Sequence, residues 1–332
     1  MKRLGGRDFK KVTVSDVPRF SKSTVLVTGG HGFLGRALRS QLASQGFDKV
    51  LAPSSVEVDL LDRQAIRAWL GQHRPELVFH LAARVGGIGA NEARPADLFH
   101  DNLIMGVQLL DECHRAGVSK VVAVATVCAY PSVTSVPFSE DDLWLGYPEP
   151  TNAPYGIAKK MLLVQSQAYR AQHGFNSVVL FPANLYGPGD NFDLDTSHVI
   201  PAIIRKIDGA MQTGADEVHL WGDGTPTREF FYVDDCARAL LAAAERHDDS
   251  APINIGTGDE ISIRECAEVI GRLLGWSGRI VWQPARPNGQ LRRRLNVSRA
   301  RERLGFVAEV RLEEGLKRTV DWWQRHRRGG TP

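Results

Sequence analysis

The chain has 332 residues, of which 43% are hydrophobic and 24% charged, a composition typical of a globular protein with one or two domains and not of a disordered chain. Its net charge of +3 is too small to predict nucleic-acid binding. The basic start lacks an apolar segment, and no run of about eighteen apolar residues follows, so we expect neither a signal peptide nor a membrane span and interpret the protein as cytoplasmic.

Short β-branched runs alternate with longer amphipathic stretches in the first half of the chain. We predict an N-terminal extension at residues 1–21, followed by buried strands at residues 24–28, 49–52, 77–80, 121–125 and 177–182. Helices are predicted from Phe33 onward, over residues 95–116 and over residues 153–173. Such alternation predicts an α/β fold, a Rossmann doubly wound parallel sheet that binds its ligands at the carboxyl ends of the strands.

The pattern loosens after Tyr186, where Gly and Pro interrupt residues 187–190, 222–226 and 284–289. We expect residues 22–185 to form the dinucleotide-binding Rossmann domain, with return segments near 229–257. Residues 186–228 and 258–328 are expected to form a smaller C-terminal substrate-binding lobe.

A glycine-rich turn, TGGHGFLG at residues 28–35, follows the first predicted strand and opens a helix. This is the context that a dinucleotide-binding fingerprint requires, because Gly29, Gly32 and Gly35 allow a tight turn and a close approach to a pyrophosphate. The stretch after the second strand, APSS at residues 52–55, has neither the acidic residue typical of NAD binding nor the Arg typical of NADP binding. We expect Asp59 to lie past the ribose, where it either contacts the adenine or caps the helix that follows Leu61.

Tyr155 and Lys159 are four residues apart in PYGIAKK. On a helix this spacing places a phenol and an ammonium on one face, where the cation can lower the pKa of the phenol and make it a proton donor or acceptor near neutral pH. The four cysteines, by contrast, are widely separated and have no CxxC or zinc-binding spacing. We therefore expect free thiols and no metal.

Several longer stretches resemble the extended short-chain dehydrogenase/reductase family, and within it the GDP-L-fucose synthases. They are HLAARVGGIGAN, CAYP, EPTNAPYGIAKK, NLYGPGDNF, SHVIPAIIRK, WGDGTPTREFFYVDD and NIGTG, and the similarity extends over residues 22–325. The resemblance implies a homodimer that epimerises C3 and C5 of a GDP-4-keto-6-deoxy-mannose and then transfers hydride from NADPH to C4. Within that family the dimer seam lies around Asn102 and Tyr155, where Leu103, Val107 and Leu110 could form it, although burial within the monomer explains these three residues equally well.

The resemblance also assigns catalytic roles. Cys128 and His198 match the pair that moves protons at C3 and C5, while Tyr155 and Thr126 match the groups that hydrogen-bond the C4 oxygen. Lys159 is expected to hold the cofactor ribose. Two alternatives stay open: Cys128 as a small buried residue, and His198 as a helix cap. Related dehydratases carry an Asp-Glu pair where this chain has Val127 and Cys128, so elimination of water is disfavoured.

Further site residues follow from the same comparison of motifs. We assign cofactor binding to Gly29, Gly32, Phe33, Leu34, Gly35, Asp59, Leu60, Ala82, Ala83, Tyr155, Lys159, Pro182, Asn184, Leu185 and His198. We assign substrate binding to Val85, Gly86, Cys128, Asn184, Lys206, Trp221, Arg228 and Arg293, with Arg228 on the diphosphate.

Two departures from the family pattern concern the cofactor. His31 stands where the synthases have an arginine in the glycine turn, and residues 52–54 replace a second basic contact. We expect NADP(H), with NAD(H) left open. An epimerase that acts on a related hexose or heptose without net reduction is the alternative function, and a catalytically silent dinucleotide sensor is a third.

Overall fold

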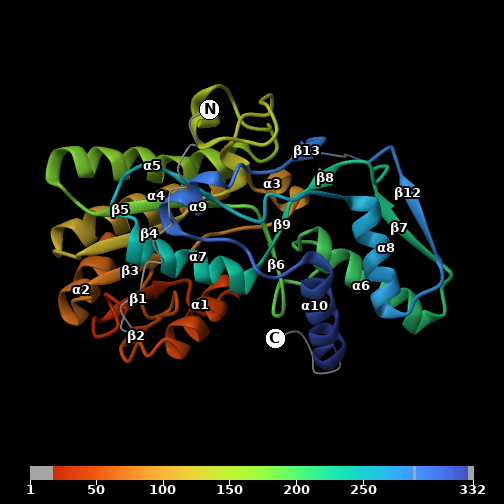
Figure 1. Cartoon of the computed structure of the whole chain (residues 1–332), viewed down its shortest axis with the longest axis horizontal. Coiled ribbons are helices and arrows are strands. Elements are labelled where there is room, and N and C mark those ends of the chain that lie inside the picture. Colours follow the sequence, from red (N-terminus) through yellow and green to blue (C-terminus); the bar gives the residue numbers. More distant parts are fainter. Residues whose placement is uncertain (1–17, 287–288, 328–332) are drawn as a thin grey trace, which may run out of the picture.

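A parallel sheet forms the centre of the larger half of the molecule (Figure 1). The computed structural model describes residues 18–286 and 289–327. Within these residues the main sheet has the order β10-β5-β4-β3-β1-β2, and its neighbouring strands pair in parallel. The strands are β1 (Val25–Thr28), β2 (Val50–Leu51), β3 (Leu77–His80), β4 (Lys120–Val124), β5 (Ser177–Pro182) and β10 (Ile253–Ile255). Strand order reverses between β1 and β3, the position at which such sheets bind ligands.

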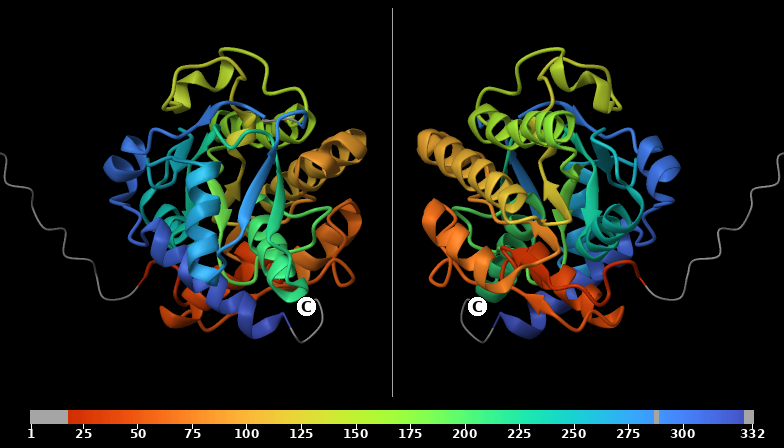
Figure 2. Two further views of the ribbon diagram at one scale, coloured as in Figure 1. Left: turned by 90° about the vertical axis from the view of Figure 1, so that its right-hand side faces the viewer. Right: turned by 90° about the vertical axis from the view of Figure 1, so that its left-hand side faces the viewer.

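Helices cover both faces of this sheet, as the end-on views of Figure 2 show. Helices α1 (Phe33–Ser44) and α7 (Val233–Arg246) pack together on one face. Helices α2 (Arg63–His73), α4 (Pro95–Arg115) and α5 (Ala153–His173) pack together on the other. Because the strands are covered on both sides, β1, β3, β4 and β5 are buried along their whole length and read as continuous apolar runs in the sequence.

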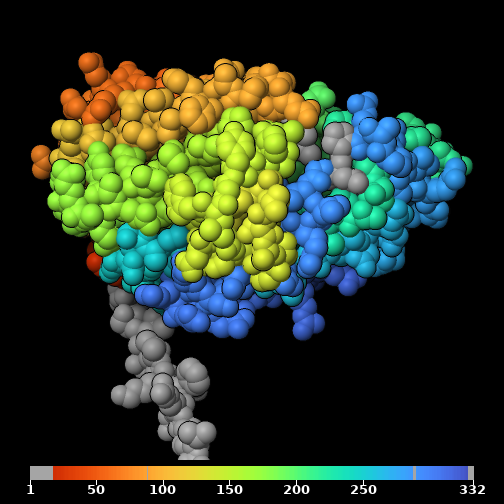
Figure 3. Space-filling view, turned by 90° about the horizontal axis from the view of Figure 1, so that it is seen from above, coloured from red at the N-terminus to blue at the C-terminus, as the bar shows by residue number. Residues whose placement is uncertain are grey.

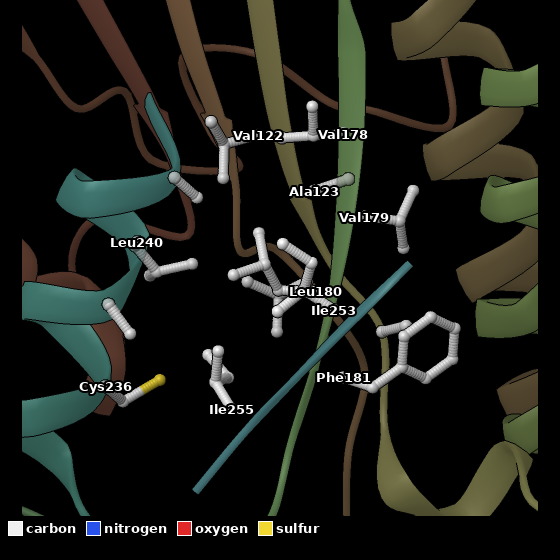
Figure 4. Packing of buried hydrophobic residues seen from close by; sticks show 14 of the residues in the cluster. Val122, Ala123, Val178, Val179, Leu180, Phe181, Cys236, Leu240, Ile253 and Ile255 are labelled. Carbon is white, nitrogen blue, oxygen red and sulfur yellow. The ribbon is translucent and has the colours of Figure 1, made fainter. Parts of the chain in front are cut away.

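The core between the sheet and α7 shows why these runs form strands. Leu180 of β5 and Ile253 and Ile255 of β10 are fully buried, and they face Cys236 and Leu240 of α7 (Figure 4). Burying one such aliphatic side chain stabilises the fold by about 1.5–3 kcal/mol. A continuous apolar face of this kind fixes the sheet on which the site is built.

A smaller part of the molecule has its own apolar cluster (Figure 1). Its regular elements include α6 (Val199–Thr213), β7 (Glu217–Trp221), α8 (Ile263–Leu274), β12 (Arg279–Gln283) and α10 (Leu312–His326). The side chains of Ile203, Ile204, Ile207, Ile270 and Leu316 are buried in this cluster. Helix α8 begins with a capping box of Ser262 and Glu265, which satisfies backbone N–H groups at its first turn.

Short strands connect the two parts. Strand β6 (Asn184–Tyr186) pairs with β9 (Phe230–Tyr232), and β8 (Thr227–Arg228) lies between β11 (Ile261–Ser262) and β13 (Arg292–Arg293). The other short elements are α3 (Ile88–Ala93), η1 (Val127–Ala129), η2 (Glu140–Trp144) and α9 (Ser298–Leu304).

The segment between η1 and α5 lies against the chain around β13, and Figure 3 shows it in yellow beside the blue residues near 290. The Phe138 N–H donates to the Arg294 carbonyl at 2.8 Å, and the Asn296 N–H donates to the Phe138 carbonyl at 2.9 Å. These bonds hold the residues that follow β13 against the segment that follows η1.

The structure confirms the predicted fold class and the predicted strands, although β2 is shorter than expected. In the predicted N-terminal extension, residues 1–17 lie outside the described residues, whereas Phe20 is buried in the core. Residues 287–288 of the predicted loop and residue 328 of the predicted lobe also lie outside them. None of the helices in residues 18–286 and 289–327 combines the length and apolar character needed to cross a membrane.

Candidate active site

The glycine-rich turn connects β1 to α1 at the point where strand order reverses. Gly29 has φ of +69°, a left-handed conformation, and a Cβ added there would lie 2.8 Å from the Ala82 nitrogen after β3. A Cβ on Gly35 would overlap the Gly29 carbonyl oxygen. Gly32 is the N-cap of α1 and offers no side-chain oxygen to the first-turn N–H groups. The glycines therefore allow the backbone of the turn to pack closely, and the uncapped N–H groups at the start of α1 are available as donors to a pyrophosphate.

Basic groups surround the far end of this turn, beside β2. The His31 Nε2 lies 2.8 Å from the Ala52 carbonyl oxygen, and Arg39 donates from Nη1 to the Gly30 carbonyl at 3.5 Å. Ser54 donates from its backbone nitrogen and its hydroxyl to the same Glu57 carboxylate oxygen, at 2.7 and 2.8 Å. Sequence reasoning missed Arg39, although its position one helical turn after Gly35 is a usable signal.

Asp59 does not cap the following helix, so that alternative was wrong. Asp62 is the N-cap of α2, because its side chain accepts from the N–H groups of Gln64 and Ala65. The Asp59 carboxylate instead accepts from the Leu61 N–H at 2.9 Å, which shapes the loop before the helix.

Lys159 lies in the interior of the site. It is 2% exposed, and in the described part of the chain its ammonium makes no hydrogen bond or ion pair. Burial lowers the pKa of Lys159 to about 8. Behind it, burial and then the charge of Lys159 lower the pKa of His80 to about 3, and the His80 Nδ1 lies 2.9 Å from the Thr28 hydroxyl. An ammonium held in this way has its donors available for a ligand.

Tyr155 lies beside Thr126 and Cys128. The phenol is surrounded by protein atoms, and this burial raises the pKa of Tyr155 well above its ordinary value. The neighbouring Cys128 raises that pKa further, while a hydrogen bond with the Thr126 hydroxyl lowers it. The expected lowering of the Tyr155 pKa was therefore wrong, because burial raises it. A neutral phenol is nevertheless the form that donates a proton.

The thiol of Cys128 is presented by the short helix η1. Thr126 caps η1 by accepting from the Cys128 N–H at 3.2 Å, and a Cβ on Gly156 would overlap the Cys128 carbonyl oxygen. Helix α5 therefore packs directly on η1. Cys128 is partly exposed, whereas Cys113, Cys236 and Cys266 are buried, and all four thiols are free as expected. The alternative of a buried structural Cys128 was wrong in this respect.

Two arginines approach Cys128 from neighbouring strands. Arg228 of β8 and Arg293 of β13 are register partners, and Arg293 donates from Nη1 to the Cys128 sulfur at 3.4 Å. Burial, followed by the charge of Arg293, lowers the pKa of Arg228 to about 10. Two adjacent guanidinium groups repel each other, so this position favours an anion.

His198 is the N-cap residue of α6, which confirms the position given by the helix-cap alternative, but its ring makes no capping hydrogen bond. Part of His198 is accessible to solvent, but many protein atoms lie around its ring. The loss of water around the ring lowers the pKa of His198. The Gly87 N–H donates to the Thr196 carbonyl at 3.2 Å, and a Cβ on Gly87 would lie 2.8 Å from the Ser197 carbonyl oxygen. The loop that contains Val85 and Gly86 therefore lies next to His198.

The other predicted substrate-binding residues make their contacts on other elements. Asn184 donates to the Glu229 carbonyl at 2.9 Å, Lys206 donates to the His219 carbonyl at 3.1 Å, and Trp221 is 49% exposed. Across residues 18–286 and 289–327, no hydrogen bond or ion pair joins His198, Lys206 or Trp221 to the Cys128 cluster. A pocket of about 370 Å³ adjoins the loop after β3, lined by Ala83, Arg84, Val85, Arg94, Asp97 and Leu98.

Comparison with known proteins assigns this arrangement to a family. Residues 25–256 match the model of the NAD dependent epimerase/dehydratase family, which is more than half of the chain. The chain belongs to this family.

Individual relatives of the family are similar over nearly the whole chain. GDP-L-fucose synthase 1 from Arabidopsis thaliana is 37% identical over 299 residues, covering 90% of this chain and 92% of the relative. GDP-L-fucose synthase from Escherichia coli is 37% identical over 312 residues, covering 91% of this chain and 97% of the relative. The structure of a GDP-L-fucose synthetase from Naegleria fowleri bound to NADP has a TM-score of 0.85 and 28% identity, and the match covers 92% of this chain and 95% of that one.

Glu229 holds backbone segments around the site in place, and its role was not predicted from the sequence. Its buried carboxylate accepts from the N–H groups of Thr257, Gly258 and Leu295, at 2.7, 2.9 and 2.7 Å, and burial raises the pKa of Glu229 to about 7. It thereby connects the end of β8 to the loop between β10 and β11 and to the residues after β13. The partners are far apart in sequence, so no local signal identifies them.

Proposed function

We propose that this protein is an NADP(H)-dependent epimerase-reductase that inverts C3 and C5 of a GDP-4-keto-6-deoxy-hexose and then reduces its C4 ketone. The observation that carries the proposal is the meeting of a phenol, a hydroxyl and a thiol, from Tyr155, Thr126 and Cys128, next to a dinucleotide-binding turn. The similarity to GDP-L-fucose synthases over about nine tenths of both chains supports the substrate class.

The residues of this chain fit the cofactor. The first-turn N–H groups of α1, which no side chain caps, can bind a pyrophosphate, and Lys159 has ammonium donors free for the ribose hydroxyls. His31 and Arg39 lie beside the end of β2, where the adenosine ribose binds in this fold, and they can meet a 2′-phosphate. When bound, NADPH supplies the hydride that reaches C4.

Proton transfer is the task of the protein side chains. A C4 ketone acidifies the C–H bonds at C3 and C5, so one group must remove a proton and another must return it on the opposite face. We assign these tasks to Cys128 and His198; the lowered pKa of His198 favours the neutral ring, which can accept a proton. Thr126 and Tyr155 hydrogen-bond the C4 oxygen as negative charge develops there, and the neutral Tyr155 later protonates it.

The GDP diphosphate is assigned to Arg228 and Arg293, whose adjacent guanidinium groups favour an anion. Val85, Gly86, Asn184, Lys206 and Trp221 are assigned to the rest of the nucleotide sugar. We further propose residues 186–228 and 258–328 as the substrate lobe, supported by their separate apolar cluster, and residues 22–185 with 229–257 as the cofactor domain.

A homodimer through the outer face of α4 and α5 is also proposed. Phe99 and Val164 are 38% and 44% exposed on this face, and Leu103 and Val107 are half-buried. Leu110 is fully buried within the monomer, which confirms the alternative for this residue and excludes it from the seam. Sedimentation of the purified protein tests the proposal, and a monomer at micromolar concentration would contradict it.

The activity is tested by mixing the protein with GDP-4-keto-6-deoxy-mannose and NADPH in D₂O. We expect oxidation of NADPH together with deuterium incorporation into the sugar, measured by absorbance and mass spectrometry. Deuterium incorporation without oxidation would instead support an epimerase without net reduction. Absence of both would contradict the proposed function, and a parallel reaction with NADH reports cofactor preference.

A further inference from the structure

The guanidinium of Arg293 faces the sulfur of Cys128 at a distance of 3.4 Å between Nη1 and Sγ. Arg293 is 8% exposed, so water screens this contact poorly. Its other side-chain hydrogen bond runs from Nε to the Gln290 amide oxygen at 3.2 Å, and within the described residues no carboxylate forms an ion pair with it. A buried positive charge without an acidic partner therefore lies next to a thiol.

The other groups around this sulfur do not cancel that charge. Arg228 approaches from β8 and adds a second positive charge. Tyr155 approaches from α5, and its phenol is neutral because burial raises its pKa well above the ordinary range. Thr126 is uncharged. Arginine beside a cysteine favours the thiolate over the thiol, because an opposite charge within about 4–6 Å stabilises an ionised acid.

We propose that Arg293 is a positioning residue for Cys128, which it orients through the hydrogen bond to Sγ and whose thiolate form it stabilises. The inference rests on the proposed function, in which one proton passes between Sγ and a sugar carbon, so that the sulfur alternates between thiol and thiolate while Arg293 stays charged. It extends the role predicted from the sequence, which was limited to substrate binding.

The test measures alkylation of Cys128 by iodoacetamide as a function of pH, in protein without substrate. Adducts are counted by intact-mass spectrometry. Cys113, Cys236 and Cys266 are fully buried, so we expect one fast adduct, and Cys128→Ser should lose it. The variants are Arg293→Met, Arg293→Lys and, as a matched control, Arg292→Met. Arg292 is the neighbouring residue in β13, but its side chain is 53% exposed and paired with Glu260.

We expect Arg293→Met to shift the midpoint of the alkylation profile upward by about one pH unit, the low end of the effect of a nearby opposite charge. At neutral pH the rate should fall about threefold, because the tenfold loss of thiolate is partly offset by the higher nucleophilicity of the more basic sulfur. Arg293→Lys should retain most of the wild-type profile, since it keeps the charge. Arg292→Met should match the wild type.

An unchanged midpoint in folded Arg293→Met would overturn the inference and leave Arg293 with substrate binding alone. If the methionine variant does not fold, as judged by circular dichroism, Arg293→Gln replaces it, since Gln keeps N–H donors without the charge. An upward shift of the alkylation midpoint in Arg293→Gln would then support the inference, and an unchanged midpoint would overturn it. Because no sugar is present, this result is independent of the proposed function, which would fail in the deuterium and NADPH assays instead.

Discussion

Replacing the buried Lys159 by Met should stabilise the protein while abolishing reduction. Burial lowers the pKa of Lys159 from 10.5 to about 8, and the residue is 2% exposed. At 1.36 kcal/mol per pKa unit, keeping this ammonium charged costs the folded state about 3 kcal/mol below pH 8. Met has a similar length, fills the same space and carries no charge. We therefore expect Lys159→Met to be more stable than the wild type by about 3 kcal/mol near pH 6.5.

The sign of the pH dependence follows from the same shift. Between pH 8 and 10.5 the unfolded chain binds the proton that folded Lys159 releases, so the wild type regains stability as the pH rises through this window. The advantage of Lys159→Met should fall to about 1.5 kcal/mol at pH 9.5. Urea unfolding at both pH values, without cofactor, measures the difference. The exposed Lys22, 81% accessible, supplies the control Lys22→Met. A Lys159→Met variant that is less stable, or whose advantage does not change with pH, would refute the reasoning.

Three further outcomes concern the chemistry. Tyr155→Phe should slow hydride transfer by about a hundredfold or more in stopped-flow NADPH oxidation, since general acid catalysis contributes at least that much; near-normal turnover would exclude Tyr155 as the acid. Cys128→Ser should abolish deuterium incorporation into the sugar with NADPH binding intact, and unchanged exchange would exclude the thiol. Gly35→Ala places a methyl group against the Gly29 carbonyl oxygen. We expect NADPH affinity to fall by about tenfold or more, and an unaltered Kd in a fluorescence titration would contradict this.

The sheet and its main helices could be predicted because buried parallel strands leave a direct trace in the sequence. Strand β5 has the predicted bounds, and α5 likewise, because Gly174 in a left-handed conformation ends that helix. Strand β2 was predicted too long, since it lies at the sheet edge and pairs only with β1. The extents of the two domains remain proposals.

The site was predictable where its residues share one local element and not where they meet through the fold. The spacing of Tyr155 and Lys159 placed both on α5, but it could not show that burial sets their proton affinities. Cys128 and Arg293 are 165 residues apart, and backbone hydrogen bonds between Phe138 and the residues after β13 help to bring their segments together. The environment of His198 also depends on the loop that follows β3, which is distant in the sequence.

The absence of a side chain at Gly156 has a consequence for how this enzyme could change its specificity. Helix α5 rests on the Cys128 carbonyl there, so Tyr155 and Cys128 move as one unit and the spacing between phenol and thiol cannot be adjusted by repacking. Any attempt to redirect catalysis to another sugar should therefore leave this unit unchanged and vary the second lobe, where positions such as Lys206 and Trp221 lie on separate elements.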